Sequence, residues 1–262
     1  MSTPSAHVDP RAAVDPQAVL GEGTTVGPFA VIGAKVVLGA RVKVHPNAVI
    51  AGPVTIGDDC EIHPFASIGG PPQDLKYRGE DTRLTIGSKN IFRESCTVNR
   101  GTVGGGGHTT IGDGNLFMAG AHVAHDCHVG SGTIFANAAT LAGHVTVEDH
   151  STIGAYSGVH QFCKIGEHAF IGGYSVITQD AMPYVLTVGN RARAMGINVI
   201  GLKRKQFPEN VVTALRRTYR TLFRSKMALK DAIDQVEAEM GSIREVAYFL
   251  EFVRSSERGV VR

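Results

Sequence analysis

The sequence predicts a mainly β protein: a parallel β-helix of hexapeptide repeats followed by a small α-helical domain. Three observations lead to this prediction. Aliphatic residues recur every six positions, small residues or valines stand four positions after them, and both patterns end near residue 182. Neither an amphipathic helix nor an alternating strand has a period of six. A β-helix with three faces per coil fits, because each face then takes one hexad and each coil about 18 residues.

The hexad frame is long and almost continuous. It runs from Val8 to Ile68, resumes at Ile86, slips by one residue before Ile111 and continues to Ile177. We expect the aliphatic residues to point into the prism, with the small residues beside them. The glycine that often follows the aliphatic residue suits a corner with an unusual φ angle. All four cysteines occupy the small position and are expected to be buried thiols: Cys60, Cys96, Cys127 and Cys163.

The repeat also predicts the domain organisation. We expect residues 1–182 to form the β-helix, with loops at 69–84 and 101–110 where the hexad pattern fails, and residues 183–262 to form the helical domain. In that domain, one helix should open at Pro208 and Glu209 and a second should end at Gly241. Ser242 and Glu245 are spaced as a capping box for a third helix.

Composition and charge narrow the class of protein. Hydrophobic residues make up 43% of the chain and there are 32 glycines, which argues against disorder and indicates many turns. Residues 181–262 carry 15 Lys and Arg against 8 Asp and Glu, whereas the rest of the chain carries 11 and 16. A basic tail on a mildly acidic body favours an acidic partner or a phosphate-bearing ligand. Without a nucleic-acid-binding motif, nucleic acid is not expected as a partner.

The location of the protein follows from what the chain lacks. The N-terminal residues Met1-Ser-Thr-Pro-Ser do not form a signal peptide, and no apolar run is long enough for a membrane span. We therefore expect a cytoplasmic protein with no membrane span and with reduced thiols.

Histidines are the candidates for chemistry. On the stride of one coil, His125, His144 and His160 should stack near one edge of the prism and share a cleft. A histidine whose pKa lies near neutrality can act as a general base on a substrate hydroxyl. Asp126 either orients His125 or is an ordinary solvated turn residue. Five others are expected to be ordinary outward-facing polar residues: His45, His63, His108, His150 and His168.

Two alternatives concern metal and the basic tail. Stacked histidines also occur in γ-class carbonic anhydrases, which use three of them to bind zinc on the same kind of β-helix. That ligand spacing would place the third ligand at Ile165, so we expect no metal. In the tail, Arg216, Arg220 and Arg224 form a helical stripe. The stripe is either a solvated face or a docking surface for an acidic protein or a phosphate.

Longer motifs resemble those of the UDP-N-acetylglucosamine O-acyltransferase family of lipid A biosynthesis, over essentially the whole chain. They are Gln73-Asp-Leu-Lys-Tyr, Arg100-Gly-Thr, His122-Val-Ala-His-Asp-Cys, Asn137-Ala-Ala-Thr-Leu-Ala-Gly-His, Val159-His-Gln-Phe-Cys and, after Asn198, Gly201-Leu-Lys-Arg. The resemblance implies a left-handed β-helix and a homotrimer with active sites between subunits. It implies transfer of an (R)-3-hydroxyacyl group from acyl carrier protein to the 3-hydroxyl of UDP-N-acetylglucosamine. The donor carries its own phosphopantetheine, so no cofactor is implied.

The resemblance also implies roles for individual residues. His125 would be the general base, with Asp126 beside it, and the Gly143 amide would hold the thioester oxyanion. Asn198 and Arg204 would contact the nucleotide. The other residues of the substrate cleft would be Gln73, Asp74, Lys76, His122, His144, His160 and Gln161.

The sequence departs from the family pattern at the nucleotide. Ile200 stands where an acid is common, and Lys205 replaces the second arginine of a pair, without the planar fork of arginine. In this family the residue at position 173 helps to measure the acyl chain. Gly173 is small and predicts a long chain, around hydroxymyristoyl, although Phe170 nearby could shorten the channel.

Two other acyl transfers remain open from the sequence. One is N-acylation of a 3-amino sugar nucleotide, and the other is acetyl transfer from acetyl-CoA by a hexapeptide acetyltransferase. The N-acyltransferase of the same pathway normally has an additional N-terminal domain, whereas the hexads begin here at Val8.

Overall fold

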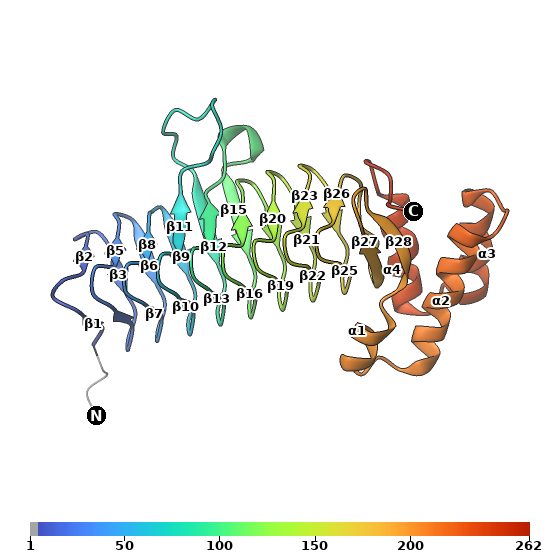
Figure 1. Cartoon of the computed structure of the whole chain (residues 1–262), viewed down its shortest axis with the longest axis horizontal. Helices are drawn as coiled ribbons and strands as arrows, with labels where there is room; N and C mark the ends of the chain where they lie inside the picture. Colours follow the sequence, from blue (N-terminus) through green and yellow to red (C-terminus); the bar gives the residue numbers. More distant parts are fainter. Residues whose placement is uncertain (1–4) are drawn as a thin grey trace.

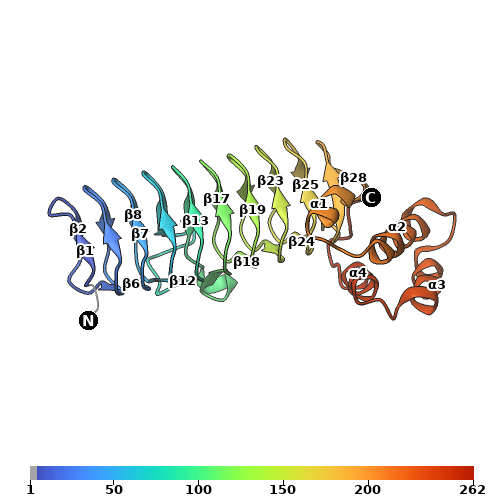
Figure 2. The ribbon, with the colours of Figure 1, turned by 90° about the horizontal axis from the view of Figure 1, so that it is seen from below.

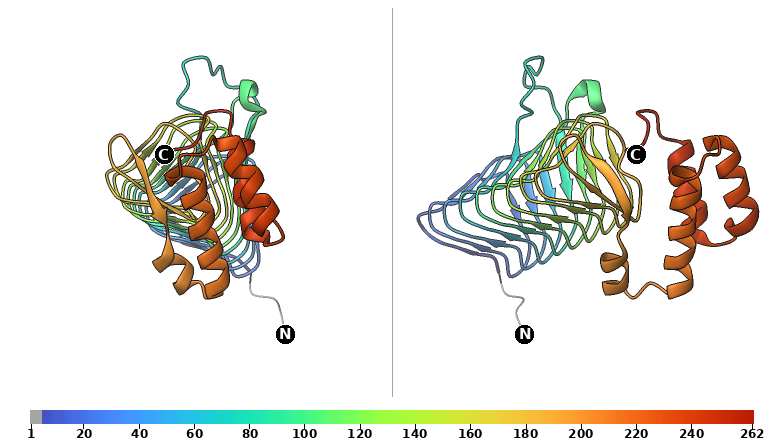
Figure 3. Two further views of the ribbon diagram at one scale, coloured as in Figure 1. Left: turned by 90° about the vertical axis from the view of Figure 1, so that its right-hand side faces the viewer. Right: turned by 45° about the vertical axis from the view of Figure 1, so that its right-hand side comes forward.

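The computed structural model describes residues 5–262, which form a long parallel β-helix with helices at its C-terminal end (Figure 1). The signal-peptide expectation concerns residues 1–4, which lie outside the described residues. Three sheets make up the faces of the prism, and successive coils run side by side along its length (Figure 2). The helices cover one end of the β-helix (Figure 3).

Each sheet takes one short strand from every coil. Sheet A contains β1 (His7–Val8), β4 (Thr25–Val26), β7 (Lys43–Val44), β10 (Glu61–Ile62), β13 (Ile91–Phe92), β16 (Leu116–Phe117), β19 (Ile134–Phe135), β22 (Thr152–Ile153), β25 (Phe170–Ile171), β27 (Val185–Val188) and β28 (Arg193–Ile197). Sheet B contains β2 (Ala13–Val14), β5 (Val31–Ile32), β8 (Val49–Ile50), β11 (Ser67–Gly70), β14 (Thr97–Asn99), β17 (His122–Val123), β20 (Thr140–Leu141), β23 (Gly158–Val159) and β26 (Val176–Ile177). Sheet C contains β3 (Val19–Leu20), β6 (Val36–Leu38), β9 (Val54–Ile56), β12 (Arg83–Ile86), β15 (His108–Ile111), β18 (His128–Val129), β21 (Thr146–Val147) and β24 (Lys164–Ile165).

The register confirms the predicted stride. His122 pairs with Thr140, and Thr140 pairs with Gly158, so neighbouring strands from β1 to β26 are 18 residues apart wherever neither loop intervenes. Except for the final hairpin of β27 and β28, the pairs of named strands are parallel. Side chains at equivalent positions of successive coils therefore lie in direct contact.

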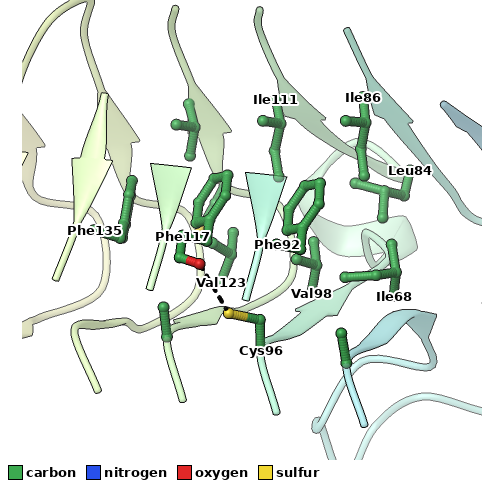
Figure 4. Packing of buried hydrophobic residues seen from close by; sticks show 14 of the residues in the cluster. Ile68, Leu84, Ile86, Phe92, Cys96, Val98, Ile111, Phe117, Val123 and Phe135 are labelled. Carbon is green, nitrogen blue, oxygen red and sulfur yellow. Dashed lines mark hydrogen bonds between the residues drawn. The ribbon is translucent and has the colours of Figure 1, made fainter. Parts of the chain in front are cut away.

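The core consists of the residues that the hexad predicts. Ile50, Ile62 and the four cysteines are buried, as expected. Figure 4 shows the middle of the core, where three phenylalanines stack face to face. The ring centroids of Phe92 and Phe117 lie 4.8 Å apart, and those of Phe117 and Phe135 lie 4.7 Å apart. Val8, in contrast, is 37% exposed, because strand β1 is the first of its sheet and pairs only with β4.

The glycines after the aliphatic residues have a different role from the one expected. Neither Gly39 nor Gly57 has a left-handed φ, but a Cβ on Gly39 would lie 2.8 Å from the carbonyl carbon of Gly57 in the next coil. The left-handed residue comes two positions later and is not glycine, as at Arg41 and Asp59, with φ of 56° and 57°. The expectation of an unusual φ was therefore wrong at Gly39 and Gly57, where glycine allows the close approach of consecutive coils, but it holds at Gly69, whose φ is 78°.

Two loops leave the prism on the same side (Figure 1). The first connects β11 to β12, and the second connects β14 to β15 and contains the short 3-10 helix η1 (Val103–Gly105). Strands β11 and β14 are neighbours in sheet B, so the two loops start one coil apart. This places them beside each other over the same part of the β-helix.

The C-terminal part begins with the hairpin of β27 and β28 and continues with α1 (Val199–Arg204), α2 (Glu209–Arg224), α3 (Leu229–Met240) and α4 (Arg244–Arg254). The start of α2 after Pro208 and the end of α3 before Gly241 are confirmed. The capping box was wrong: Ile243 is the N-cap of α4 and makes no side-chain capping bond. The sequence did not predict α1.

Two separate clusters of buried apolar residues divide the chain. The cluster inside the prism ends at Ala181, and the cluster of the C-terminal part begins at Met182. This division supports the proposed domain boundary at residue 182, which stays a prediction. In the part of the chain that the structure describes, no helix combines the length and apolar character needed to cross a membrane.

The role of the glycines can be tested by substitution. Gly39→Ala should lower the free energy of unfolding by about 1–3 kcal/mol, because the new Cβ would collide with the next coil. The matched control is Gly104→Ala, whose Cβ would meet no atom within 4 Å. Denaturant unfolding of both variants measures the difference. Equal stability of the two variants would contradict the close-approach explanation.

Candidate active site

His125 and Asp126 follow strand β17 and form a hydrogen-bonded pair at the turn between sheets B and C. Asp126 has a left-handed φ of 58° and is buried, with 2% of its surface exposed. The Nδ1 atom of His125 lies 2.8 Å from Asp126 Oδ2. Because a carboxylate accepts hydrogen bonds, Nδ1 carries the proton and the lone pair is on Nε2. The solvated-turn alternative for Asp126 is excluded by its burial.

The second loop holds Asp126 in place. The backbone N–H of Thr102 donates to Asp126 Oδ1 at 2.8 Å, and the Thr102 hydroxyl donates to Oδ2 at 2.6 Å. A Cβ on Gly105 would lie 2.1 Å from Asp126 Cγ, so only glycine lets this loop approach so closely. Thr102 is a site residue that the sequence reasoning missed. Its signal was the break of the hexad phase in a run of glycines at 101–110.

Gly143 lies against the ring of His125 from the next coil. A Cβ at this position would be 2.6 Å from His125 Cε1 and 2.9 Å from Nε2. Any side chain there would displace the imidazole. The backbone of Gly143 is therefore next to the nitrogen that carries the lone pair.

His144 and His122 flank the pair. The ring of His144 meets that of His125 edge to face at 5.2 Å, and its Nε2 lies 3.8 Å from Asp126 Oδ2. His144 also stacks on Phe162 at 4.5 Å. Burial lowers the pKa of His144 below the ordinary histidine value. Burial, and then the nearby His125, lowers the pKa of His122 as well.

Two adjoining cavities collect most of the predicted site residues. A cavity of about 440 Å³ is lined by Gln73, His122, His125, Gly143 and His160, with Val176 and Ile177 at its apolar end. A cavity of about 320 Å³ is lined by Asp74, Lys76, Thr102, His144 and Phe162. The contact between His125 and His144 separates them. Gln161 follows His160 along the chain, and its carbonyl accepts from His160 Nδ1 at 3.1 Å.

Two groups of predicted residues lie elsewhere in the chain. Asn198 caps helix α1 by accepting from the backbone N–H of Gly201 at 3.1 Å, and Arg204 is the last residue of that helix. Helix α1 lies below the β-helix in Figure 1, whereas both loops rise above it. Phe170 is on the outer face of sheet A, and Gly173 is in the turn after it. One chain therefore does not bring Asn198 and Arg204 to the cavities.

Three of the site residues could also hold a metal ion. One ligand atom each from His125, Asp126 and His144 lies within 4.8 Å of the others, an arrangement that the spacing argument did not find. Both oxygens of Asp126 already accept hydrogen bonds from His125 or Thr102. This set of donors fits an aspartate that orients a histidine base. That no metal binds here stays a prediction.

Comparison with known proteins places this chain in a family. Residues 180–261 match the family model described as UDP N-acetylglucosamine O-acyltransferase, domain 2, and residues 35–70, 108–143 and 144–179 match the bacterial transferase hexapeptide model. The acyl-[acyl-carrier-protein]–UDP-N-acetylglucosamine O-acyltransferase of Alkalilimnicola ehrlichii is 52% identical over 256 residues, or 98% of this chain and 99% of that protein. The protein of the same name from Anaeromyxobacter dehalogenans is 49% identical over 191 residues, or 73% of this chain and 74% of its own.

Solved structures of similar proteins support the same family assignment. LpxA from Acinetobacter baumannii has a TM-score of 0.94 at 44% identity, covering 97% of this chain and 99% of that one. The UDP-N-acetylglucosamine acyltransferase of Francisella novicida also has a TM-score of 0.94, at 32% identity, covering 97% of this chain and 94% of that one. The fold is thus the left-handed parallel β-helix that the resemblance implied. The chain belongs to the UDP-N-acetylglucosamine O-acyltransferase family.

Proposed function

We propose that this protein transfers an (R)-3-hydroxyacyl group from acyl carrier protein to the 3-hydroxyl of UDP-N-acetylglucosamine, the first step of lipid A biosynthesis. The observation that carries the proposal is the buried Asp126–His125 pair, which faces a cavity at Gly143. Relatives that match nearly the whole chain carry the name of this reaction. No observation favours N-acylation or acetyl transfer from acetyl-CoA.

The reaction begins with the lone pair on His125 Nε2. This nitrogen takes the proton of the sugar 3-hydroxyl as the oxygen attacks the thioester carbonyl. The carbonyl oxygen becomes an oxyanion, which the backbone N–H of Gly143 would stabilise. When the intermediate collapses, the ester forms, the carbon–sulfur bond breaks, and the phosphopantetheine thiolate takes the proton back from His125. Asp126 stabilises the imidazolium in between.

The neighbouring histidines support this role by remaining neutral. Because burial lowers the pKa values of His122 and His144, neither carries a full charge near neutral pH. A charged neighbour would make protonation of His125 more costly. As neutral rings they can still donate and accept hydrogen bonds. We assign them, with Gln73, Asp74, Lys76, His160 and Gln161, to binding of the sugar and the donor.

The nucleotide contacts require a second chain. Asn198 and Arg204 belong to α1, on the opposite side of the β-helix from the loops (Figure 1). Large aromatic side chains are exposed along the corner between sheets A and B: Phe29, Phe65, Tyr156 and Tyr174. Such a row is typical of an interface between subunits. We propose a homotrimer in which a neighbouring copy covers this corner and supplies Asn198 and Arg204 to the cavity.

The acyl chain would follow the outer face of sheet A. Ile134, Thr152 and Phe170 form a ladder on this face, with Ile134 and Phe170 both exposed. Gly173 follows Phe170 at the corner, and a Cβ there would be 3.2 Å from the carbonyl oxygen of Ala155. The absence of a side chain at Gly173 supports a long chain, around hydroxymyristoyl.

The basic stripe of α2 suits the donor protein. Arg216, Arg220 and Arg224 surround a cavity of about 260 Å³ beside Met195. Acyl carrier protein is acidic, so we propose that it docks here by charge complementarity. The carrier brings its own phosphopantetheine, so no separate cofactor is proposed. We place the reaction in the cytoplasm with the carrier.

An acyl-transfer assay tests the reaction and the base together. Purified protein should transfer hydroxymyristate in preference to hydroxydecanoate, and to UDP-N-acetylglucosamine in preference to its 3-amino analogue. His125→Ala should lower kcat by about 10²–10⁴-fold, because the proton acceptor is lost.

His128→Ala is the matched control, since this exposed histidine lies on sheet C and hydrogen-bonds to Thr110. It should retain activity close to that of the unmodified enzyme. Full activity of His125→Ala would refute the assignment of the base, and preference for the amino sugar would refute the proposed acceptor.

The shared site can be tested by mixing defective chains. His125→Ala and Arg204→Glu chains should each be poor enzymes alone. Co-assembled trimers should regain activity, because one interface can then combine an intact His125 from one chain with an intact Arg204 from the other. Mixtures no more active than the mean of the separate variants would show that both residues act within one chain.

Charge reversal tests the docking surface. Arg216→Glu with Arg220→Glu should raise the KM for acyl carrier protein by about 10-fold or more, with little change in kcat at saturation. The defect should shrink at high salt, which screens the attraction in the unmodified enzyme. Lys230→Glu on the exposed face of α3 is the control. An equal rise in KM for both variants would argue against a specific surface.

A further inference from the structure

A second cluster of metal-ligating side chains lies outside the catalytic cavities. His45 follows strand β7, Glu61 lies in the next strand of the sheet, β10, and His63 follows it. The register of β7 and β10 places His63 one coil beyond His45. Their rings stack with centroids 4.6 Å apart and an angle of 21° between the planes. The sequence predicted only ordinary outward-facing histidines here.

The ligand atoms of this cluster converge on one point. His45 Nε2 lies 2.7 Å from Glu61 Oε1, and His63 Nε2 lies 3.5 Å from the same oxygen. One ligand atom from each of the three residues lies within 4.8 Å of the others. We propose that His45, Glu61 and His63 bind one divalent transition-metal ion of the zinc type, at a site separate from the catalytic centre.

The distances suit such an ion. Ligand atoms about 2.0–2.2 Å from a tetrahedral Zn²⁺ are separated by about 3.3 Å. The two distances to Glu61 Oε1 lie on either side of this value, so small side-chain movements bring all three atoms into range. The ion would replace the proton shared by His45 and Glu61, and water would complete the coordination.

A second carboxylate supports the site from behind. Glu94 Oε1 lies 3.4 Å from His63 Nδ1, on the side of the ring away from Glu61. Arg93 holds Glu94 through hydrogen bonds of 3.1 Å to each carboxylate oxygen. A carboxylate on the far nitrogen of a ligating histidine fixes the ring and makes the other nitrogen a better ligand. A hydrogen bond between His45 and Glu61 alone would not require this second carboxylate beside His63.

Burial and charge favour a soft cation over a hard one. The side chains of His45, Glu61 and His63 are 35%, 32% and 16% exposed in the single chain. The hydrogen bond from His45 lowers the pKa of Glu61, and burial lowers the pKa of His63, which leaves an ionised carboxylate and a neutral imidazole. Lys43 and Arg93 offset the charge of the two glutamates nearby. Imidazole ligands therefore decide the affinity, and these suit zinc rather than Mg²⁺ or Ca²⁺.

Another stacked pair provides a matched control. His150 and His168 also lie on successive coils, with ring centroids 4.8 Å apart and 28° between the planes. Among the described residues, this pair is not part of any set of three converging ligand atoms. It has the same stacking without the same ligand geometry.

Zn²⁺ titration of chelator-treated full-length protein tests the proposal. Calorimetry should show Zn²⁺ binding to a site from which excess Mg²⁺ does not displace the ion. His63→Gln should weaken Zn²⁺ binding by more than about 100-fold and Glu94→Gln by about 10–100-fold, whereas His150→Gln should leave it unchanged. Zn²⁺ should raise the Tm of the unmodified protein and of His150→Gln but not that of His63→Gln. If His63→Gln fails to fold, Glu94→Gln alone decides the question.

Three outcomes would overturn the proposal. One is the absence of Zn²⁺ uptake by the unmodified protein. Another is unchanged affinity in both His63→Gln and Glu94→Gln. The third is loss of the bound ion in His144→Gln with no loss in His63→Gln, which would place it in the catalytic cavity instead.

Discussion

The structure depends on one constraint: the backbone hydrogen bonds that hold each coil at a fixed register on the next. Because His122 pairs with Thr140 and Thr140 with Gly158, every residue faces its equivalent one coil away. This register stacks Phe92, Phe117 and Phe135 in the core and leaves room only for glycine where coils approach most closely. A residue of the β-helix is therefore selected for its fit to two neighbouring coils as well as to its own.

The same register builds the candidate active site. His125 and Gly143 come from consecutive coils, and the ring of one rests on the backbone of the other. The loop of residues 101–107 adds what the ladder cannot supply, two hydrogen bonds that fix the buried Asp126. A rigid repeat thus sets the distance between the base and the proposed oxyanion site. An irregular loop sets the orientation of the base.

The fold could be predicted from the sequence because a period of six residues fits a β-helix with three faces. The stride then predicted that His125 and His144 lie near one another. The sequence analysis missed features that depend on irregular segments of the backbone. Thr102 reaches Asp126 only through a loop whose path no period describes, and Ser242 does not cap α4 because Ile243 takes that position. The cluster at His45 required the position of Glu61, an outward residue of a neighbouring strand. The sequence pattern also could not show that Asn198 and Arg204 lie away from the two cavities within one chain.

The closing hairpin has a consequence for the open end of the β-helix. A parallel β-helix ends in a strand edge whose unpaired N–H and C=O groups could template another chain, as in a growing fibril. Here β28 pairs antiparallel to β27 and ends the ladder of parallel coils. Helix α2 packs on β28, and the Tyr219 hydroxyl donates to the carbonyl of Ala194 in that strand at 2.8 Å. The C-terminal domain therefore also blocks end-to-end polymerisation of β-helices.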